Sequence, residues 1–399
     1  MLQIEIALER ILRVVPAPTP ETIPLEEANG RVFADAITSQ IDLPPFDNSA
    51  MDGYAVRSAD VAAANKENPI RLKVIGRAAA GEVWPGQLVS GTCLRLFTGS
   101  ALPGGADSVV MQEDTIVESD GIVRVLEAGK PWENVRFQGE DLKQGSVLAR
   151  AGEICRSNGV SLLAAAGCSQ VRVGKCPRVG LLATGSELVE PGEVLSRGKI
   201  YESNRAGLSV VTSRCGGRSK IFPIVKDSLK ETQSALRQAL LDCDILITTG
   251  GVSVGEMDFV KQAIEEIGGM LEFWKVAIKP GRPFVFGTAQ GKLLFGLPGN
   301  PVSALVTFLL LVRPALLRWQ GAIELGLPSI PGKLVESVSN PGNRPHFVRV
   351  KIDEAGNVRL AGTQASHILS SLAAANGLIK IAPDATLSAN TPVNVLQWE

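Results

Sequence analysis

This 399-residue sequence has few histidines, no closely spaced cysteine pair and almost no excess of either charge. The six cysteines include no C-x-x-C pair, which argues against structural zinc and against a disulfide framework. The two histidines, His346 and His367, are too few for a histidine-rich metal site, and neither lies in a nucleophile motif. Forty basic residues against 41 acidic ones give a net charge of −1, which argues against nucleic-acid binding through bulk charge. Any anion site must therefore be local.

Long apolar runs are missing too. The longest, at 302–312, is about half of the ~20 residues that a membrane span needs, so we expect a buried helix there. The first 15 residues place their apolar side chains at helical spacing, and they carry Glu5, Glu9 and Arg10 where a signal peptide needs an unbroken apolar core. We therefore expect an N-terminal amphipathic helix, no membrane association and a cytoplasmic location.

Three styles of sequence alternate along a chain that is too long for one ordinary core. Residues 21–170 contain short β-branched runs separated by glycine and proline, which predicts a largely β region that ends with a helix at 157–167. From about residue 175, apolar strands alternate with glycine-bearing loops and helices, which predicts a mostly parallel, doubly wound α/β sheet. Short alternating strands after the last helix predict a small β domain. The fold class is thus α/β plus β.

Three of the expected parallel strands end in short loops that contain glycine: TGSEL (184–188), TTGGVSVGE (248–256) and GLPGNP (296–301). Carboxyl ends of parallel strands meet at one edge of a sheet, so we expect the loops to lie together, each before a helix, and to cradle phosphates. Each loop alone is equally compatible with a structural turn. The candidate ligand-binding residues in them are Thr184, Gly185, Ser186, Thr249, Gly250, Gly251, Ser253, Gly255, Pro298, Gly299 and Asn300.

Carboxylates follow two of these loops. Glu187 and Asp258 are expected to converge on the same edge of the sheet, where carboxylates beside phosphates are the usual protein ligands of Mg²⁺. Asp258 and Asp227 could equally serve as helix N-caps, and that alternative stays open at this point.

A cationic segment at 273–287, FWKVAIKPGRPFVFG, carries Lys275, Lys279 and Arg282. We interpret it as an extended stretch before a Pro-Gly turn. Its lysines could protect a strand edge, but their apolar neighbours favour a partly buried surface whose cations need anions. In the β region, PPFDNSAMDGYAVR (44–57) and LFTGSALPGGAD (96–107) place Asp52 and Thr98 in loops, and the first of these loops mixes large apolar side chains with polar ones.

Together, FDNSAMDGYA, FTGSALPGGAD, ATGSEL, TTGGVSVGEMDF, KVAIKPGRPF and GLPGNPVSA resemble the molybdopterin molybdenumtransferases, the molybdate insertases of molybdenum-cofactor synthesis. The E domain of gephyrin is similar. The resemblance covers nearly the whole chain and implies an elongated homodimer of four-domain subunits. The implied domains are a molybdopterin-binding α/β domain (1–20 and 172–320), a linking domain (21–42 and 139–171), an inserted β-rich domain (43–138) and a C-terminal β-barrel (327–399).

The resemblance also implies a reaction, in which adenylylated molybdopterin and molybdate give AMP and the molybdenum-loaded cofactor with the help of Mg²⁺. Glu187 and Asp258 would lie near the metal, and Lys275, Lys279 and Arg282 would hold molybdate or phosphate. The partner subunit would present Asp52 and Thr98, while Arg349 and Ser366 match the substrate-binding pattern less closely. Ser186 stands where many relatives carry an acidic residue, which leaves one candidate metal ligand fewer. The implied catalytic residues are Asp52, Thr98, Asp141, Glu187, Asp227, Asp258, Lys275 and Lys279.

Two alternatives remain open. A gephyrin-like scaffold would use the dimer surface to bind other proteins, and the absence of a fused domain or long linker in these 399 residues weighs against it. The preceding step, adenylylation of molybdopterin, uses an enzyme that shares the α/β domain but would lack the β-rich half with MDGYA and FTG. That adenylylating enzyme and the apo-molybdoenzymes that receive the cofactor are the candidate partners.

Overall fold

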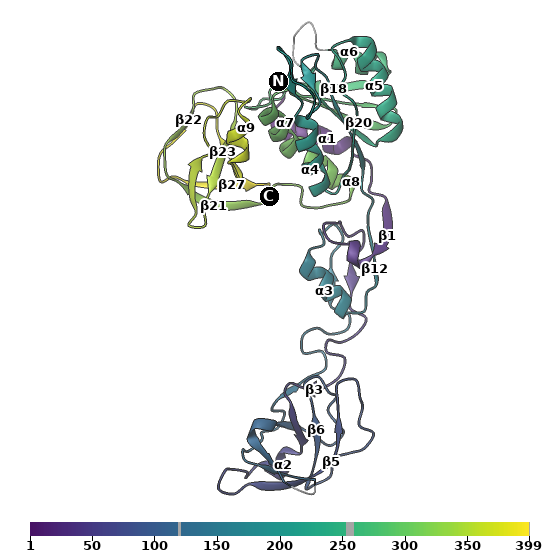
Figure 1. The fold of residues 1–399 in the computed structure, drawn as a ribbon, viewed down its shortest axis with the longest axis vertical. Helices are drawn as coiled ribbons and strands as arrows, with labels where there is room; N and C mark the ends of the chain where they lie inside the picture. The colour runs from purple at the N-terminus through teal and green to yellow at the C-terminus, as the bar shows by residue number, and fades with distance from the viewer. Residues whose placement is uncertain (119–120, 253–258, 399) are drawn as a thin grey trace. The chain divides into compact units, whose positions relative to one another are not determined.

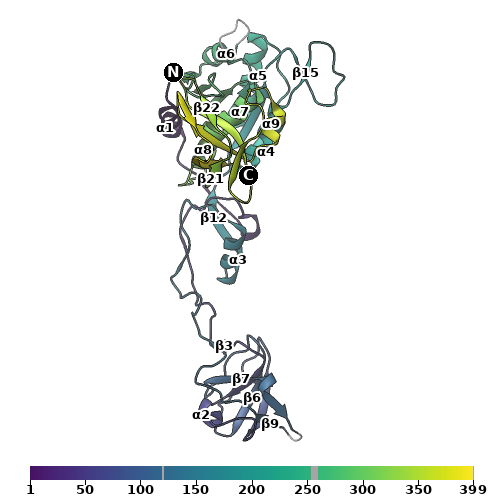
Figure 2. The same ribbon diagram turned by 90° about the vertical axis from the view of Figure 1, so that its left-hand side faces the viewer.

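The computed structural model describes residues 1–118, 121–252 and 259–398. The chain divides into two compact units, each with hydrophobic cores of its own (Figures 1 and 2). The first unit contains Met1–Asp35, Ala151–Arg156 and Gln170–Glu399, and the second contains Ala36–Arg150 and Ser157–Ser169.

A six-stranded sheet in the order β16-β13-β17-β20-β19-β18 forms the centre of the first unit (Figure 1). The first four strands are parallel, whereas β19 runs antiparallel to both of its neighbours. The prediction of a mostly parallel sheet is therefore confirmed. In sheet order, the strands are β16 (Arg218–Ile221), β13 (Arg178–Ala183), β17 (Ile245–Thr249), β20 (Lys292–Leu297), β19 (Val285–Ala289) and β18 (Met270–Trp274).

Helices cover both faces of this sheet because successive side chains of its strands point to opposite faces. In β17, Ile245 and Ile247 enter the core cluster that includes Ile4, whereas Leu246 enters the cluster with Leu236. The first cluster holds α1 (Ile4–Val14), α4 (Asn204–Arg214), α7 (Pro301–Thr307), the π-helix η3 (Phe308–Val312) and α8 (Arg313–Trp319). The second holds α5 (Leu229–Asp242) and α6 (Val260–Glu266). The sheet is thus doubly wound, as predicted.

The expected buried helix is the continuous segment Pro301–Trp319. Among the described residues it is the one helix long and apolar enough to cross a membrane. However, 72% of its apolar window is buried inside the protein, as in a core helix. Pro301 occupies its first turn, where a missing N–H costs nothing.

The C-terminal part of the first unit is a closed barrel with its own core, which confirms the expected β-barrel. Its strands, in barrel order, are β21 (Ser329–Leu334), β24 (Asn357–Leu360), β23 (His346–Ile352), β25 (Gly377–Ile381) and β27 (Pro392–Gln397). The short helix α9 (Leu369–Ala373) contacts α7 of the α/β domain. Smaller two-stranded ladders pair β1 (Pro20–Pro24) with β12 (Gln170–Gly174), β14 (Leu188–Val189) with β15 (Ile200–Tyr201), and β22 (Val338–Asn340) with β26 (Ala385–Leu387).

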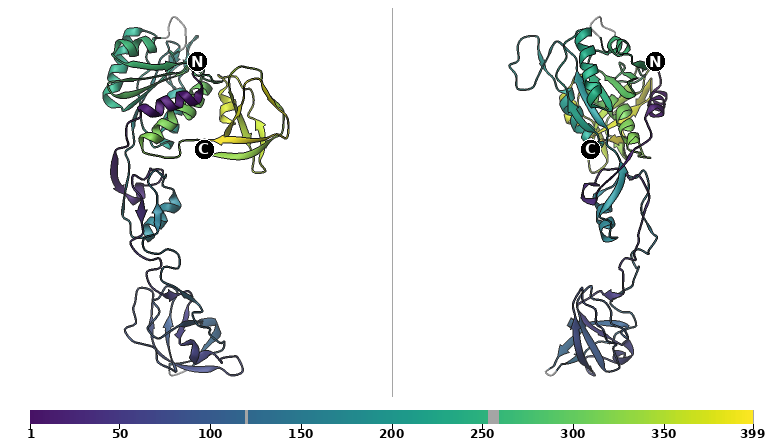
Figure 3. Two further views of the ribbon diagram at one scale, coloured as in Figure 1. Left: turned by 180° about the vertical axis from the view of Figure 1, so that it is seen from behind. Right: turned by 90° about the vertical axis from the view of Figure 1, so that its right-hand side faces the viewer.

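The second unit is built on another six-stranded sheet, in the order β7-β4-β6-β5-β9-β8. Figure 3 shows the ribbon of this unit, in purple and blue, from two further sides. Its helix α3 (Ser157–Ala165) lies where the sequence predicts one. The sheet strands are β4 (Gly53–Val56), β5 (Ile70–Ala78), β6 (Thr92–Leu96), β7 (Ser108–Met111), β8 (Thr115–Val117) and β9 (Ile122–Val125). Short pairs join β2 (Ile37–Thr38) to β11 (Val147–Ala149) and β3 (Asn48–Ser49) to β10 (Val135–Arg136), and α2 spans Ser58–Val61.

Gly53, the first residue of β4, has no room for a side chain. A Cβ atom there would lie 2.0 Å from the backbone oxygen of Val110 in β7, the paired strand. Gly53→Ala should therefore lower the free energy of unfolding by about 2 kcal/mol or more, as overpacking of a core does, measured by urea unfolding.

Gly159→Ala is the matched control in the same unit. A Cβ at Gly159, in helix α3, would meet nothing within 4 Å, so this change should leave stability unchanged or raise it by up to ~1 kcal/mol. Equal stabilities for the two variants would contradict the close contact between β4 and β7.

Candidate active site

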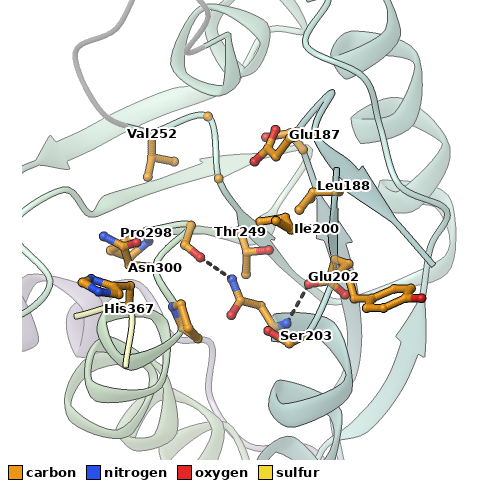
Figure 4. A pocket seen from close by; sticks show the side chains of 18 of the residues that line it. Glu187, Leu188, Ile200, Glu202, Ser203, Thr249, Val252, Pro298, Asn300 and His367 are labelled. Carbon is orange, nitrogen blue, oxygen red and sulfur yellow. Dashed lines mark hydrogen bonds between the residues drawn. The ribbon is translucent and has the colours of Figure 1, made fainter. Parts of the chain in front are cut away.

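The three glycine-bearing loops meet at a cavity of about 660 Å³ in the first unit (Figure 4). The strands before them end at the same level, because Ala183 pairs with Thr249 and Thr249 pairs with Leu297. The cavity thus lies at the carboxyl edge of the sheet, where ligands of such folds bind. The loop residues that line it include Thr184, Gly185, Glu187, Thr249, Gly250, Gly251, Pro298, Gly299 and Asn300.

Glycine is required where the second loop approaches the first. Gly250 and Gly251 have φ angles of 84° and 63°, in the left-handed region. A Cβ atom on Gly250 would lie 2.4 Å from the carbonyl oxygen of Thr184, and one on Gly251 would lie 2.8 Å from the Thr184 hydroxyl. A Cβ on Gly299 would lie 3.6 Å from the Cα of Gly250, so the third loop packs directly against the second.

The first loop differs from the prediction, because no helix follows TGSEL. The chain instead forms β14, a loop at residues 190–199 and β15, and α4 begins only after β15. The segment from β14 to β15, residues 188–201, is called the excursion below. The expectation that all three loops precede a helix N-terminus was wrong here, and sequence reasoning missed α4. Its signal was the serine before the helix together with apolar spacing at Leu208 and Val211.

The excursion adds a wall to the cavity that the sequence did not identify. Leu188, Ile200, Tyr201, Ser203 and Asn204 all line it. The Asn204 side chain donates from Nδ2 to the carbonyl oxygen of Gly299 at 2.8 Å, which ties this wall to the third loop.

Groups able to bind phosphate are distributed unevenly over the loops. The N–H groups of Thr184, Gly185 and Ser186 already donate to the carbonyls of Thr249 and Val225 and to the Asp227 carboxylate. This internal pairing leaves the first loop less able to cradle an anion through its backbone than the sequence suggested.

Other groups at this edge remain unpaired within the described residues. The backbone N–H groups of Gly251, Gly299 and Asn300 make no hydrogen bond there. The buried hydroxyls of Thr184 and Thr248 also lack a partner in that part of the chain. Buried polar groups are rarely left without a partner, so these atoms fit a polar ligand or ordered water.

Two carboxylates face the cavity with free oxygen atoms. Asp227 accepts the Ser186 N–H through Oδ2 at 2.8 Å, and its own N–H donates to the Ser186 hydroxyl at 3.1 Å. Ser228, and not Asp227, caps α5, so the capping alternative for Asp227 is wrong. The Glu187 carboxylate lies over Gly185 and has no hydrogen-bond partner among the described residues, although the Glu187 carbonyl accepts from the Ile200 N–H at 2.9 Å.

A third carboxylate in the lining, Glu202, is already engaged. It is buried and accepts from the backbone N–H of Asn204 at 2.7 Å and from Nε of Arg205 at 2.8 Å. No cluster of three or more metal-ligating side chains occurs in residues 1–118, 121–252 and 259–398. Mg²⁺ commonly needs only one or two carboxylates plus substrate phosphates, so Glu187 and Asp227 fit such an ion. Ser253, Gly255 and Asp258 lie outside the described residues.

The cationic segment is irregular and not extended. Lys275 has a φ of 72°, and between β18 and β19 the chain makes isolated bridges at Val276 and Lys279 instead of a strand, so the expected extended stretch was wrong. The apolar neighbours Val276 and Ile278 are fully buried, as predicted. Within the part of the chain that the structure describes, Lys275, Lys279 and Arg282 form no ion pair with a carboxylate.

Positive groups crowd around this segment. The Nζ atoms of Lys275 and Lys261 lie 3.7 Å and 4.3 Å from the ring centroid of Trp274. Partial burial, followed by the charges of Arg282 and Lys261, lowers the pKa of Lys275. An anion bound here would relieve this repulsion.

The barrel fixes the cationic segment through its strand β23. The N–H of Lys279 donates to the carbonyl of Pro345 at 2.9 Å, and the carbonyl of Lys279 accepts from Phe347 at 2.7 Å. Between them, His346 is buried, and both of its ring nitrogens lack a partner among the described residues. Burial first, then the nearby charge of Lys279, lowers the pKa of His346 to about 4, so its imidazole is neutral at pH 7. No sequence motif marked this residue.

The barrel also reaches the cavity through its loop at 363–369. Arg349 is fully buried and donates to the carbonyls of Thr363 at 2.8 Å and Ala365 at 3.1 Å. The hydroxyl of Ser366 accepts from Nδ2 of Asn300 at 3.1 Å. Arg349 therefore positions the loop that carries Ser366 and does not line the cavity itself, whereas His367 and Leu369 of this loop do.

The remaining predicted residues belong to the second unit. The Asp52 carboxylate accepts from the backbone N–H and from the hydroxyl of Thr98, both at 2.8 Å. These two bonds, the backbone one first, lower the pKa of Asp52 below its usual range. Asp141 is exposed, and its N–H donates to the carbonyl of Leu43 at 3.0 Å.

Comparison with known proteins accounts for most of the chain. The MoeA N-terminal region (domain I and II) matches residues 2–167, a probable molybdopterin binding domain matches 180–318, and the MoeA C-terminal region (domain IV) matches 331–398. A molybdopterin molybdenumtransferase of Haemophilus influenzae is 37% identical over 385 residues, which cover 95% of this chain and 94% of the relative. The chain belongs to the molybdopterin molybdenumtransferase family.

Other members of the family agree. Molybdopterin molybdenumtransferase 2 of Mycobacterium tuberculosis is 36% identical over 396 residues, which cover 98% of this chain and 97% of the relative. The crystal structure of the molybdopterin biosynthesis moeA protein of Pyrococcus horikoshii has 33% identity, a TM-score of 0.84 and full coverage of both chains. Membership confirms the resemblance, the fold class and the enzyme class, a transferase of molybdenum-cofactor biosynthesis.

The hydrogen bonds from Thr98 to Asp52 predict the outcome of a simple titration. Thr98→Val removes the hydroxyl but keeps the backbone N–H, so the pKa of Asp52 should rise part of the way towards its ordinary value. Carboxyl-carbon NMR across the acid range would measure it. Thr98→Ser, which keeps a hydroxyl, should titrate like the wild type, and an unchanged midpoint in Thr98→Val would contradict the hydroxyl's contribution.

Proposed function

We propose that this protein inserts molybdate into adenylylated molybdopterin, releasing AMP and forming the molybdenum cofactor. The observation that carries the proposal is the cavity at the carboxyl edge of the sheet. There, unpaired N–H groups, Thr184 with its unpaired hydroxyl, and two carboxylates line one space, next to a segment with three cations that lack carboxylate partners among the described residues. A substrate that carries phosphates and meets an oxyanion needs both features.

The phosphates are assigned to the centre of the cavity. The N–H groups of Gly251, Gly299 and Asn300 and the hydroxyl of Thr184 orient them there. Glu187 and Asp227 hold Mg²⁺, together with Asp258 by the family pattern. When bound, the ion withdraws charge from the phosphate oxygens and so favours cleavage of the pyrophosphate link. This arrangement needs no ligand at Ser186, whose hydroxyl is occupied by the Asp227 N–H.

Molybdate is assigned to the cationic segment. Lys275, Lys279 and Arg282 carry charge that the described part of the chain does not neutralise, and Pro283, the next residue, lines the cavity. An anion there is therefore adjacent to the substrate site. Water cleaves the pyrophosphate link, so AMP leaves and the other phosphate stays on the pterin. At the dithiolene, both sulfurs bind molybdenum, and one oxo group of molybdate leaves as water with the two thiol protons. The cations of the segment stabilise the charge on molybdate during this replacement.

The working assembly is proposed to be a cytoplasmic homodimer. Asp52 and Thr98 lie in a different compact unit from the cavity, and the family pattern assigns them to the active site of the partner subunit. Proposed partners are the adenylylating enzyme that supplies the substrate and the apo-molybdoenzymes that receive the product.

The direct test mixes purified protein with adenylylated molybdopterin, Mg²⁺ and molybdate, and measures AMP. We expect AMP release that requires both molybdate and Mg²⁺. Lys279→Ala should abolish it without changing the thermal unfolding midpoint, because the side chain is exposed. AMP release at the wild-type rate without molybdate would refute insertion as the reaction, and no release under any condition would do the same.

A mixing experiment tests the shared site. Asp52→Ala and Lys279→Ala should each be inactive alone. After the two variants are unfolded and refolded together, about a quarter of wild-type activity should return, because half of the dimers are mixed and one of their two sites is intact. Activity that stays at zero, with mixed dimers verified by differential tags, would place Asp52 and Lys279 in the same subunit's site.

A further inference from the structure

In the second unit, an arginine that no motif marked lies beside the pair of Asp52 and Thr98. Arg95 belongs to β6 and stands directly opposite Tyr54 of β4 in the antiparallel ladder. Residues directly opposite each other in such a ladder share a face of the sheet, so their side chains lie together. Asp52 precedes β4 and Thr98 follows β6, which places both at the same end of this ladder.

Two aromatic rings hold the guanidinium of Arg95. Its Cζ atom lies 5.0 Å from the ring centroid of Tyr54 and 5.2 Å from that of Phe97. The faces of aromatic rings attract cations, and arginine is the residue most often found there. Tyr54 is itself buried in a hydrophobic core of this unit, so the support under the guanidinium is fixed.

The same guanidinium binds the backbone around Asp52 by two routes. Its Nη1 donates to the carbonyl of Gly53, the next residue, at 3.3 Å. Its Nη2 donates to Oε1 of Gln112, and the backbone N–H of Gln112 donates to the carbonyl of Asp52 at 3.0 Å. Two successive carbonyls are therefore held, one directly by Arg95 and one through Gln112.

The charge of Arg95 has a smaller effect on Asp52 than these contacts suggest. The two bonds from Thr98 lower the pKa of Asp52 most, and the charge of Arg95 contributes least. Arg95 forms no ion pair with a carboxylate among the described residues, whereas Arg71 of the same sheet pairs with Glu118. The contacts of Arg95 thus fix a position more than they neutralise a charge.

We propose that Arg95 is a positioning residue, which fixes the backbone of Asp52 so that the carboxylate stays bonded to Thr98. The inference rests on the proposed function, because Asp52 belongs to the active site only in that reaction. It adds a residue to the pattern that already includes Asp52 and Thr98, and it assigns the new residue no contact with the substrate.

Two other roles of Arg95 lead to different results. If Arg95 acted through charge alone, lysine would replace it without loss. If it only stabilised the unit, its replacement would lower the unfolding midpoint and leave the Asp52 carboxylate unchanged. A lysine ammonium keeps the charge but lacks the planar fork with which Arg95 reaches Gly53 and Gln112 together, so Arg95→Lys distinguishes these roles.

The test compares Arg95→Lys with the wild type in the AMP-release assay and in the NMR titration of Asp52. We expect kcat to fall about tenfold or more, because a small displacement of a catalytic group is costly. The KM for molybdate should change by less than about twofold, since Arg95 does not bind the oxyanion. The pKa of Asp52 should rise towards its ordinary value as the bonds from Thr98 loosen. Wild-type kcat, or an unchanged pKa of Asp52, would overturn the proposal.

Gln112→Leu is a second variant that leaves the aromatic support of Arg95 intact. It removes one acceptor of the guanidinium but keeps the backbone N–H that binds Asp52. Because Gln112 is exposed, the change should not disturb folding. We expect kcat and the pKa of Asp52 to shift in the same directions as in Arg95→Lys, though less. Wild-type values of both would contradict the proposal even if Arg95→Lys folds poorly.

Arg71→Lys is the matched control. Its side chain is 66% exposed on β5 of the same sheet and pairs with Glu118, so kcat and the pKa of Asp52 should both remain at their wild-type values. A loss of kcat as large as in Arg95→Lys would assign the effect to the sheet as a whole and overturn a specific role of Arg95.

The two measurements separate this inference from the proposed function. Molybdate-dependent AMP release that is unaffected by Arg95→Lys would refute the positioning role alone. A raised pKa of Asp52 in Arg95→Lys, in a protein whose wild type shows no molybdate-dependent release, would uphold the positioning of Asp52 and refute insertion as the reaction.

Discussion

The close approach of two backbones, Gly250 against the carbonyl of Thr184, is the constraint on which this site depends. Any side chain at Gly250 would separate the second loop from the first. The loops after β13, β17 and β20, whose strands end at the same level, would then no longer line one cavity. The pairing of Thr184, Gly185 and Ser186 with neighbouring groups makes the first loop a rigid support. The N–H groups of Gly251, Gly299 and Asn300 in the other two loops, by contrast, make no hydrogen bond among the described residues.

The barrel completes the α/β domain's site. Two of its segments contact that domain: Pro345 and Phe347, on either side of His346, bond to the backbone of Lys279, and the 363–369 loop bonds to Asn300 through Ser366. Arg349, which is buried in the barrel, donates hydrogen bonds to backbone carbonyls of that loop. The folded barrel therefore holds the loop in position. Because His346 next to Lys279 is neutral, it adds no further positive charge to the cationic segment, whose side chains already lack carboxylate partners among the described residues.

The sequence predicts the parts of this structure that depend on periodicity and strand ends. The buried strands, helix Pro301–Trp319 and the meeting of three loops follow from apolar spacing and sheet topology. It did not predict the β14–β15 excursion or the role of Arg349, because both depend on partners distant in sequence, such as Gly299 and Thr363. The sequence also did not predict the left-handed φ of Lys275, because lysine, unlike glycine, has no preference for that conformation.

The second unit is inserted within the chain of the first, and this nesting has a consequence for synthesis. Helix α1, residues 4–14, packs against α8, residues 313–319, in one core. On the ribosome, α1 emerges long before α8, so its apolar face stays uncovered until nearly the whole α/β domain has been made. The inserted unit, complete by residue 169, can fold while that face is still exposed. Chaperone dependence during translation should therefore concentrate on the N-terminal helix.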